Sequence, residues 1–297
     1  MYQFKKGGSI LGDLLYYEFD SIAEFLNYIE NAPTNIAVWC DPQYLASMEG
    51  NYDFCQTNSL EEAISYCRFG THPDIEKLEH LNIELNKYLT IDNHQSRKRN
   101  YYVGYAPNVK AYLEGNPLAM YCKKNPQRKH IHIYYNTSVS AFVSKKQILH
   151  RGVITINLVE MLEMMGYSVS LHLFNMGFLA NQVFYTNFLF KKSGERLNVR
   201  KLYFPLCHPS FLRRLVFRLN EVTPNIMPAW PFGYGYPCTD EMVREQLKLK
   251  KQDIVINKPD VMNVFGKNLF SDAEAMMEYI DKQTDQEHSL KPFQKRR

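Results

Sequence analysis

The chain has 297 residues, of which 45% are hydrophobic and 22% are charged. This length allows one large or two ordinary domains with a sizeable core, which excludes a small disulfide-stapled scaffold and a largely disordered chain. The formal net charge of +4 at pH 7 is too small to identify a nucleic-acid-binding protein by itself.

The cysteines predict free thiols in a reducing compartment, because none of them forms a CxxC motif or a short-domain framework. They are Cys40, Cys55, Cys67, Cys122, Cys207 and Cys238. The amino terminus lacks the apolar run of a signal peptide, and no stretch approaches 18 uncharged apolar residues. We therefore expect a soluble protein without a membrane span or a cleavable export signal.

The first hundred residues predict a small α/β region. Apolar spacing and capping residues predict helices at 21–30, 59–66 and 75–88, and a short strand at 35–39. Asp20 or Ser21 is the expected cap of the first helix, and Gly70 is expected to close the second. The polar stretch 90–100 is the expected boundary, so we assign residues 1–100 to an N-terminal α/β region.

Residues 101–283 predict a second, larger α/β domain, and residues 284–297 a basic, flexible tail. Strands are expected at 101–105, 130–135, 168–174, 183–190, 199–204 and 253–256. Helices are expected at 109–117, 153–166, 241–250 and 271–281, and one more from Pro209 onwards. The segment 223–237 is rich in Pro, Gly and aromatic residues and is expected to be a structured loop.

The clearest unit runs from strand 130–135 through a hydroxyl-rich loop into a long helix and a second strand. The loop contains Asn136, Ser138 and Ser140. Because ligands bind at the strand-end loops of open α/β sheets, these three residues are the predicted ligand-binding loop.

This unit resembles the opening of a von Willebrand factor A-type domain. It consists of a strand, the loop Asn136-x-Ser138-x-Ser140, a long helix and a second strand. The resemblance implies a doubly wound, mostly parallel sheet and an Asp-x-Ser-x-Ser motif that holds a divalent ion with a Thr and an Asp from later loops. Here Asn136 replaces the leading Asp, and no Asp occurs between Ala141 and Thr239. We therefore predict no cofactor and a degenerate metal-adhesion site. Two alternatives remain for this loop. It binds magnesium, or its side chains only hydrogen-bond to backbone groups at the turn from strand to helix.

Other motifs resemble an uncharacterised family of bacteriophage proteins over about residues 59–237. They are His208-Pro209-Ser210-Phe211-Leu212-Arg213-Arg214-Leu215, Tyr234-Gly235-Tyr236-Pro237, Gly115-Asn116-Pro117-Leu118-Ala119-Met120 and Leu162-Glu163-Met164-Met165-Gly166-Tyr167. The resemblance implies a protein of the bacterial cytoplasm or of the virion, and it implies no activity.

Three further groups have two interpretations each. His130 and His132 lie on one face of a strand, where they form a metal edge or face solvent. Cys207-His208 forms a thiolate pair or a helix entry. A basic surface at Arg213, Arg214 and Arg218 binds phosphate or a partner, or is simply solvated.

Basic clusters at 97–99, 123–129 and 295–297 alternate with tyrosines and would bind nucleic acid if they converged. The common nucleotide-binding and hydrolase motifs are missing from the sequence. The sequence thus favours a non-enzymatic module for protein binding or assembly, with Asn136–Ser140 and 234–237 near the binding edge. A nucleic-acid-binding accessory protein and a structural virion component are the alternatives.

Overall fold

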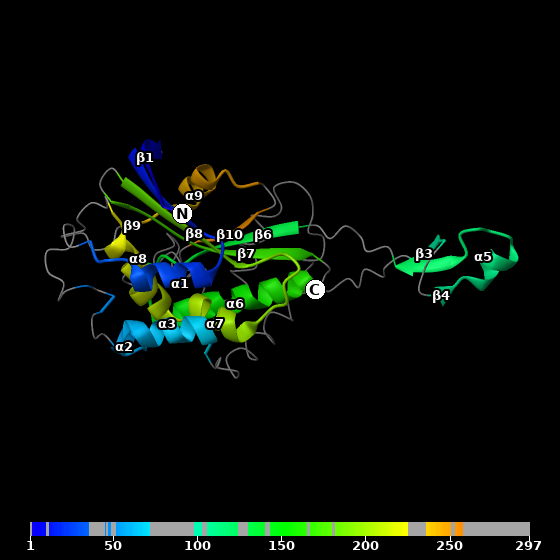
Figure 1. Ribbon diagram of the computed structural model, residues 1–297, viewed down its shortest axis with the longest axis horizontal. Helices are drawn as coiled ribbons and strands as arrows, with labels where there is room; N and C mark the ends of the chain where they lie inside the picture. The colour runs from blue at the N-terminus through cyan, green and yellow to red at the C-terminus, as the bar shows by residue number, and fades with distance from the viewer. Residues whose placement is uncertain are drawn as a thin grey trace, which may run out of the picture.

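The computed structural model describes residues 2–9, 12–35, 45, 47–48, 52–71, 98–102, 106–123, 130–139, 143–164, 167–179, 182–224, 236–250 and 253–257. The predicted helices at 75–88 and 271–281, the tail, Ser140 and most of the strand predicted at 35–39 lie outside these residues. The described part is an α/β protein built on one large sheet with helices on both sides (Figure 1).

The large sheet is mixed. Its strands are β1 (Tyr2–Ser9), β2 (Gly12–Phe19), β6 (His130–Asn136), β7 (Ser168–Leu179), β8 (Gln182–Lys191), β9 (Tyr236–Pro237) and β10 (Ile254–Ile256). They are ordered β1-β2-β8-β7-β6-β10, and β9 pairs with β7. The pairs β2/β8, β6/β7 and β6/β10 are parallel, whereas β1/β2, β7/β8 and β7/β9 are antiparallel. The expectation of a mostly parallel sheet is therefore corrected to a mixed one, because hairpin connections join β1 to β2 and β7 to β8.

The N-terminal elements belong to this sheet. Strand β2 pairs with β8 along its whole length, from Asp13 opposite Gln182 to Phe19 opposite Phe188. Phe19 stacks on Phe188 with ring centroids 5.7 Å apart. The first residues of the chain therefore share a core with residues after 130, and they do not form a layer of their own.

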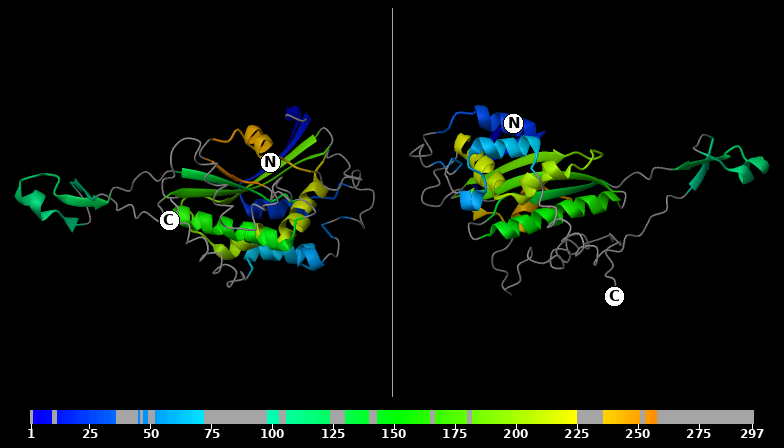
Figure 2. Two further views of the ribbon diagram at one scale, coloured as in Figure 1. Left: turned by 180° about the vertical axis from the view of Figure 1, so that it is seen from behind. Right: turned by 90° about the horizontal axis from the view of Figure 1, so that it is seen from below.

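Five helices and a π-helical stretch cover one face of the sheet (Figures 1 and 2). They are α1 (Ile22–Asn31), α3 (Leu60–Phe69), α6 (Lys145–Met164), α7 (Val199–Cys207), η2 (Phe211–Val216, the π-helical stretch) and α8 (Phe217–Val222). Alternate residues of the strands, such as Ile131, Ile133 and Tyr135 of β6, point into this core. A short helix, α2 (Tyr52–Cys55), precedes α3.

The opposite face is covered in part by α9 (Asp240–Leu247). Val243 of this helix packs in a second, smaller cluster with Met176 and Val255. Thr239 caps α9 by accepting a hydrogen bond from the N–H of Met242.

The central helix α6 is buried almost all round. Val153, Ile154, Ile156, Leu158 and Val159 are all nearly inaccessible to solvent. The middle of this helix has no polar side, because it is enclosed by the sheet and by α7. Neither α6 nor any other helix in the described part of the chain is long and apolar enough to cross a membrane.

A small unit, called here the projecting unit, lies between α3 and β6 in the sequence. It consists of β3 (Lys98–Tyr101), β4 (Ala106–Pro107), α5 (Val109–Leu113) and β5 (Met120–Lys123), with a sheet ordered β3-β5-β4. Figures 1 and 2 show it standing away from the large sheet. The domain boundary expected at residue 100 thus falls inside β3.

The segment 199–204, predicted as a strand, is the helix α7. Its apolar residues alternate over too short a stretch to decide between the two structures. Asn198 caps the helix by accepting a hydrogen bond from the N–H of Lys201 at 3.2 Å, and Leu202 and Leu206 pack in the core. The capping residue and the four-residue apolar spacing together favour the helix.

Candidate functional site

The loop after β6 is a closed network of polar groups. Asn136 is fully buried, and its Nδ2 donates a hydrogen bond to Oδ1 of Asn257 at 2.6 Å. Asn136 Oδ1 accepts from the N–H of Ser138 at 2.9 Å, and the Ser138 hydroxyl donates to Oδ1 of Asn175. Asn257 Nδ2 donates to the carbonyl of Cys238. The predicted site residues Asn136 and Ser138 are thus brought together, but their polar atoms are used inside the protein.

A buried arginine lies beneath this loop. Arg151 of α6 donates from Nε to the Tyr135 hydroxyl at 2.9 Å and from Nη1 to the main-chain oxygen of Asn257 at 3.2 Å. Its guanidinium also lies 4.4 Å from the centre of the Tyr135 ring. Burial raises the pKa of Tyr135 to about 12, against the opposing effect of Arg151. A fixed positive charge therefore sits next to the residue that pairs with Asn136.

This donor set does not suit a divalent metal ion. Magnesium prefers carboxylates and water, whereas Asn136 and Asn257 offer neutral amides close to a guanidinium. The adjoining cavity, lined by Thr137, Arg151 and His208 among others, has a volume of about 10 Å³, which is room for one water molecule at most. Among the described residues, no group of three or more His, Cys, Asp or Glu side chains is arranged to hold a metal.

A second cluster of polar side chains lies on the face of the sheet opposite α6. His130 and His132 share one face of β6, as predicted, with ring centroids 4.2 Å apart. His172 of β7 joins them, and its Nε2 lies 3.1 Å from His132 Nδ1. Tyr134 stacks on His172 with ring centroids 4.6 Å apart, and His130 Nε2 lies 2.8 Å from the Ser170 hydroxyl.

The pKa values of His132 and His172 are both lowered, which favours their neutral forms. Burial lowers the pKa of His172 to about 4, with His132 as a second cause, and the Asn187 side chain acts in the opposite direction. Burial also lowers the pKa of His132, and His130 adds to this effect while Asp253 opposes it. His132 and His172 hydrogen-bond to each other, so the two facing nitrogens are used within the cluster and do not form an open metal edge.

Cys207 and His208 do not form a thiolate pair. Cys207 is fully enclosed in the core, and burial raises the pKa of its thiol. His208 Nδ1 accepts a hydrogen bond from the N–H of Ser210 at 3.3 Å, and burial lowers the pKa of the ring to about 4. The adjacent pair is a helix end followed by a helix entry, which is the second of the two predicted interpretations.

The predicted basic surface at Arg213, Arg214 and Arg218 needs correction, since Arg214 is 0% and Arg218 8% exposed. Arg214 donates to the carbonyls of Ser47 at 2.9 Å and Thr57 at 3.0 Å. Its guanidinium thereby anchors a segment distant in sequence onto η2, and it is not available to a ligand.

Arg218 and Arg213 are also used within the fold. Arg218 donates to the carbonyls of Ile29 and Ala32 and to the Thr34 hydroxyl, at 3.4, 3.2 and 2.6 Å. It therefore binds carbonyls at and just beyond the end of α1, where a positive charge is favourable. The Arg213 guanidinium lies 5.1 Å from the Phe54 ring and 5.3 Å from the Phe217 ring.

The projecting unit carries exposed apolar side chains. Val109, Tyr112 and Leu113 of α5 are 61%, 72% and 78% exposed, and Tyr102 is 73% exposed. Positions 109, 112 and 113 fall on one side of a helix, whereas Ala111 is buried beneath it. Half of the large hydrophobic side chains that are exposed in the described residues are therefore on this small unit.

Sequence reasoning missed His172, Asn175 and Asn257 as members of these clusters. His172 could have been found, since Ser168, Ser170 and His172 alternate on a strand that runs parallel to His130 and His132. Asn257 follows the strand predicted at 253–256, but nothing in the sequence identifies that strand as the neighbour of β6.

The comparisons give one match. No curated protein and no solved structure matches the chain. One family matches residues 7–284, which includes all the elements described above except the first residues of β1. The chain therefore belongs to the family described as a domain of unknown function, DUF7192.

Proposed function

We propose that this protein is a non-enzymatic module for protein binding or assembly, and that the projecting unit presents the binding surface. The observation that carries the proposal is the exposed face of Val109, Tyr112 and Leu113. Exposed apolar side chains gathered on one face are typical of interaction sites, because leaving them in water is unfavourable. The unit also stands clear of the large sheet, so a partner could reach it without steric hindrance (Figure 1).

The electrostatics of the polar clusters support a role without catalysis. The buried thiol of Cys207 and the histidines at 132, 172 and 208 have pKa values shifted toward their neutral forms, mainly by burial. Each of these groups is enclosed by, or hydrogen-bonded to, other parts of the protein. Nucleophilic catalysis would need a nucleophile with an adjacent base and an open substrate position, and Cys207 and His208 do not provide them.

We further propose that the sheet is a degenerate von Willebrand factor A-like domain. In support, β6 and β7 are parallel and joined by the long helix α6, β8 returns antiparallel, and β10 pairs on the other side of β6. Asn136 is the last residue of β6 and Asn257 directly follows the adjacent parallel strand β10, so both lie at the carboxyl edge, where carboxylates would meet around an ion. In this protein a hydrogen bond between two amides takes the place of that ion.

The experiment for the main proposal is a pull-down from the native host with the tagged full-length chain, with and without nuclease, analysed by mass spectrometry. We expect a stoichiometric protein partner that survives nuclease. The double variant Tyr112→Ser, Leu113→Ser should recover at least tenfold less of this partner. Phe69→Ser is the matched control, because Phe69 is 75% exposed on α3 but lies outside the projecting unit. Retention of the partner by the double variant would contradict the proposal.

A nucleic-acid-binding accessory role is the second candidate, and the pairing of β3 with β5 favours it. Lys98 lies opposite Lys123 in the register of this pair, so two of the basic clusters seen in the sequence are neighbours at the base of the projecting unit. Recovery of nucleic acid, with all proteins lost on nuclease treatment, would replace the first proposal by this one. Binding should then weaken steeply with salt.

The place of action is proposed from the resemblance of several motifs to bacteriophage proteins. A phage-type protein of this kind would act in the cytoplasm of a bacterial host or in the virion. A structural component would be present in purified particles at a fixed copy number, whereas an assembly factor would be found only in infected cells. Quantitative mass spectrometry of purified particles separates these two outcomes.

A further inference from the structure

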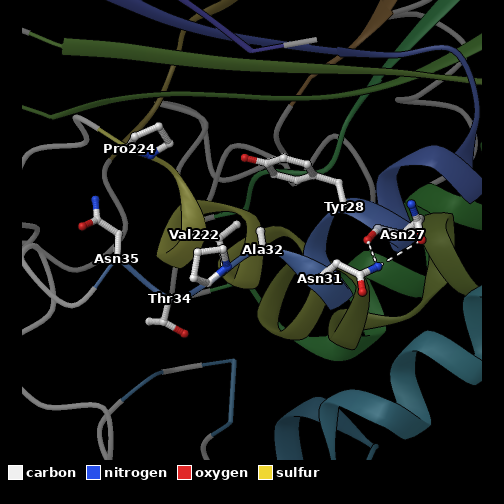
Figure 3. A pocket seen from close by; sticks show the side chains of 9 residues that line it. Asn27, Tyr28, Asn31, Ala32, Thr34, Asn35, Val222 and Pro224 are labelled. Atoms are coloured by element: carbon white, nitrogen blue, oxygen red, sulfur yellow. Dashed lines mark hydrogen bonds between the residues drawn. The ribbon is translucent and has the colours of Figure 1, made fainter.

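A groove with a volume of about 670 Å³ lies at the end of α1, where residues 32–35 pass the end of α8. Its walls are the last turns of α1, the segment 32–35 and the end of α8 (Figure 3). This volume is in the range of sites that hold small ligands or peptide segments.

The walls of the groove are held in place by hydrogen bonds. The N–H of Asn35 donates to the carbonyl of Glu221 at 2.9 Å, and its Nδ2 donates to the carbonyl of Thr223 at 3.1 Å. Arg218 binds the carbonyl of Ala32 and the hydroxyl of Thr34 from behind. The groove is therefore already formed before a ligand arrives, which lowers the entropic cost of binding.

The described part of the groove lining carries no charged side chain. None of the described residues that line the groove is an acid or a base of the Asp, Glu, Lys, Arg or His type. Ala32, Val222, Pro224 and the ring of Tyr28 supply apolar surface, and the side chains of Asn27 and Asn31 supply amides. A charged ligand would lose its hydration without gaining an ion pair, so this lining favours an uncharged ligand with both apolar and hydrogen-bonding parts.

The two amides have the spacing of an extended main chain. Asn27 and Asn31 are one helical turn apart, which corresponds to about 6 Å along α1. Alternate residues of an extended peptide are about 6.6 to 6.8 Å apart. One face of α1 can thus engage alternate residues of an extended strand that lies along it.

The side chains of Asn27 and Asn31 are also oriented to hydrogen-bond to a peptide main chain. Asn31 Nδ2 donates to both the main-chain oxygen and Oδ1 of Asn27, at 2.7 and 3.0 Å. This leaves a donor, Asn27 Nδ2, and an acceptor, Asn31 Oδ1, on two exposed side chains. A peptide carbonyl and a peptide N–H are the complementary groups.

We propose that this groove binds an extended, uncharged peptide segment of a partner protein. Asn27 and Asn31 hydrogen-bond to its main chain, and small apolar side chains of the segment contact Ala32, Val222 and Pro224. The site is separate from the exposed face of α5 and does not depend on it.

The test uses fluorescence anisotropy with the full-length protein and a set of labelled, N-acetylated and C-amidated hexapeptides in which small apolar and uncharged polar residues alternate. We expect binding by members of this set and at least a tenfold loss when a central residue is replaced by Lys or Glu. Asn31→Ala should weaken binding at least fivefold, and Ala32→Phe should abolish it by filling the groove. Glu30→Gln, on the same helix but outside the groove, is the matched control.

Two results would overturn the proposal. One is the lack of binding by every uncharged peptide of the set, and the other is equal binding by wild type, Asn31→Ala and Ala32→Phe. Circular dichroism and thermal melts establish that each variant is folded. The double variant Tyr112→Ser, Leu113→Ser should bind the peptides normally, so failure at α5 and failure at the groove can be distinguished.

Discussion

Gly152 in the middle of α6 permits the close approach of α7, and replacing it with Ala tests the packing of the core. A Cβ atom at this position would lie 2.4 Å from the main-chain oxygen of Leu206 and 2.5 Å from Sγ of Cys207. Both distances are far below ordinary van der Waals contact. Because the Leu206 oxygen belongs to the main chain of α7, it cannot rotate away, and the whole helix would have to move.

The expected loss of stability combines two opposing effects. Overpacking a core costs about 1 to 3 kcal/mol, and the upper end applies here because main chain is involved. Ala favours the helical conformation over Gly by about 1 kcal/mol. Gly152→Ala should therefore destabilise the protein by about 2 kcal/mol, which corresponds to a fall in Tm of about 4 to 8 °C for a domain of this size.

Urea and thermal unfolding followed by circular dichroism provide the measurement. The cost of Gly152→Ala should be smaller in a Cys207→Ala background, because one of the two close contacts is then removed. Gly194→Ala is the control: nothing lies within 4 Å of its Cβ, and its φ of +79° gives a backbone cost that Cys207 does not affect. If Gly152→Ala melted at or above the wild-type temperature, the close packing of α6 on α7 would be refuted.

Three further predictions concern the polar clusters. Asn136→Asp removes the hydrogen-bond donor to Asn257 and buries a carboxylate, so we expect the free energy of unfolding to fall by about 3 kcal/mol. Magnesium should partly restore this stability in thermal melts. No effect of magnesium would argue against a degenerate ion site. His172 has its pKa lowered from 6.5 to about 4 in the folded state, so the unfolded chain binds more protons, and stability should fall as pH drops from about 6.5 towards 4. In His172→Gln the fall should be shallower, and an unchanged pH profile would contradict the assignment. Arg218→Met should increase the rate of amide hydrogen exchange at the end of α1, whereas the exchange rates in α6 should stay unchanged. Lys201→Met is the control variant.

Local signals in the sequence were reliable at α1 and α3, where capping residues were recognised, whereas the Asn198 cap of α7 was missed and that helix was predicted as a strand. Ser21 and Ser59 cap α1 and α3 through the N–H groups of Glu24 and Glu62, as predicted. Gly70 ends α3 with a φ of +85°, a conformation that other residues rarely adopt. The long helix and the strands β7 and β8 also follow the predicted periodicity, and the four cysteines in the described core are buried and form no disulfide.

The sheet order could not be predicted, because it depends on contacts between distant residues. Strands β1 and β2 gave no clear sequence signal, and the pairing of β2 with β8 joins residues about 170 positions apart. The burial of Arg214 and Arg218 has the same origin. Their partners, the carbonyls of Thr57 and Ile29, are separated from them by 157 and 189 positions. Without these partners, arginines on an amphipathic helix indicate a solvated face.

The closed loop after β6 bears on where a partner can bind. In an open α/β sheet the carboxyl ends of parallel strands normally form the ligand site. Here Asn136 and Asn257 bind each other, Ser138 binds Asn175, and Arg151 places a positive charge beneath them. A ligand at this edge would have to break these buried hydrogen bonds, and each group left unpaired would cost about 1 to 3 kcal/mol. Binding at α5 or in the groove beside α1 would break none of them, which supports the proposal that partners bind at these peripheral surfaces.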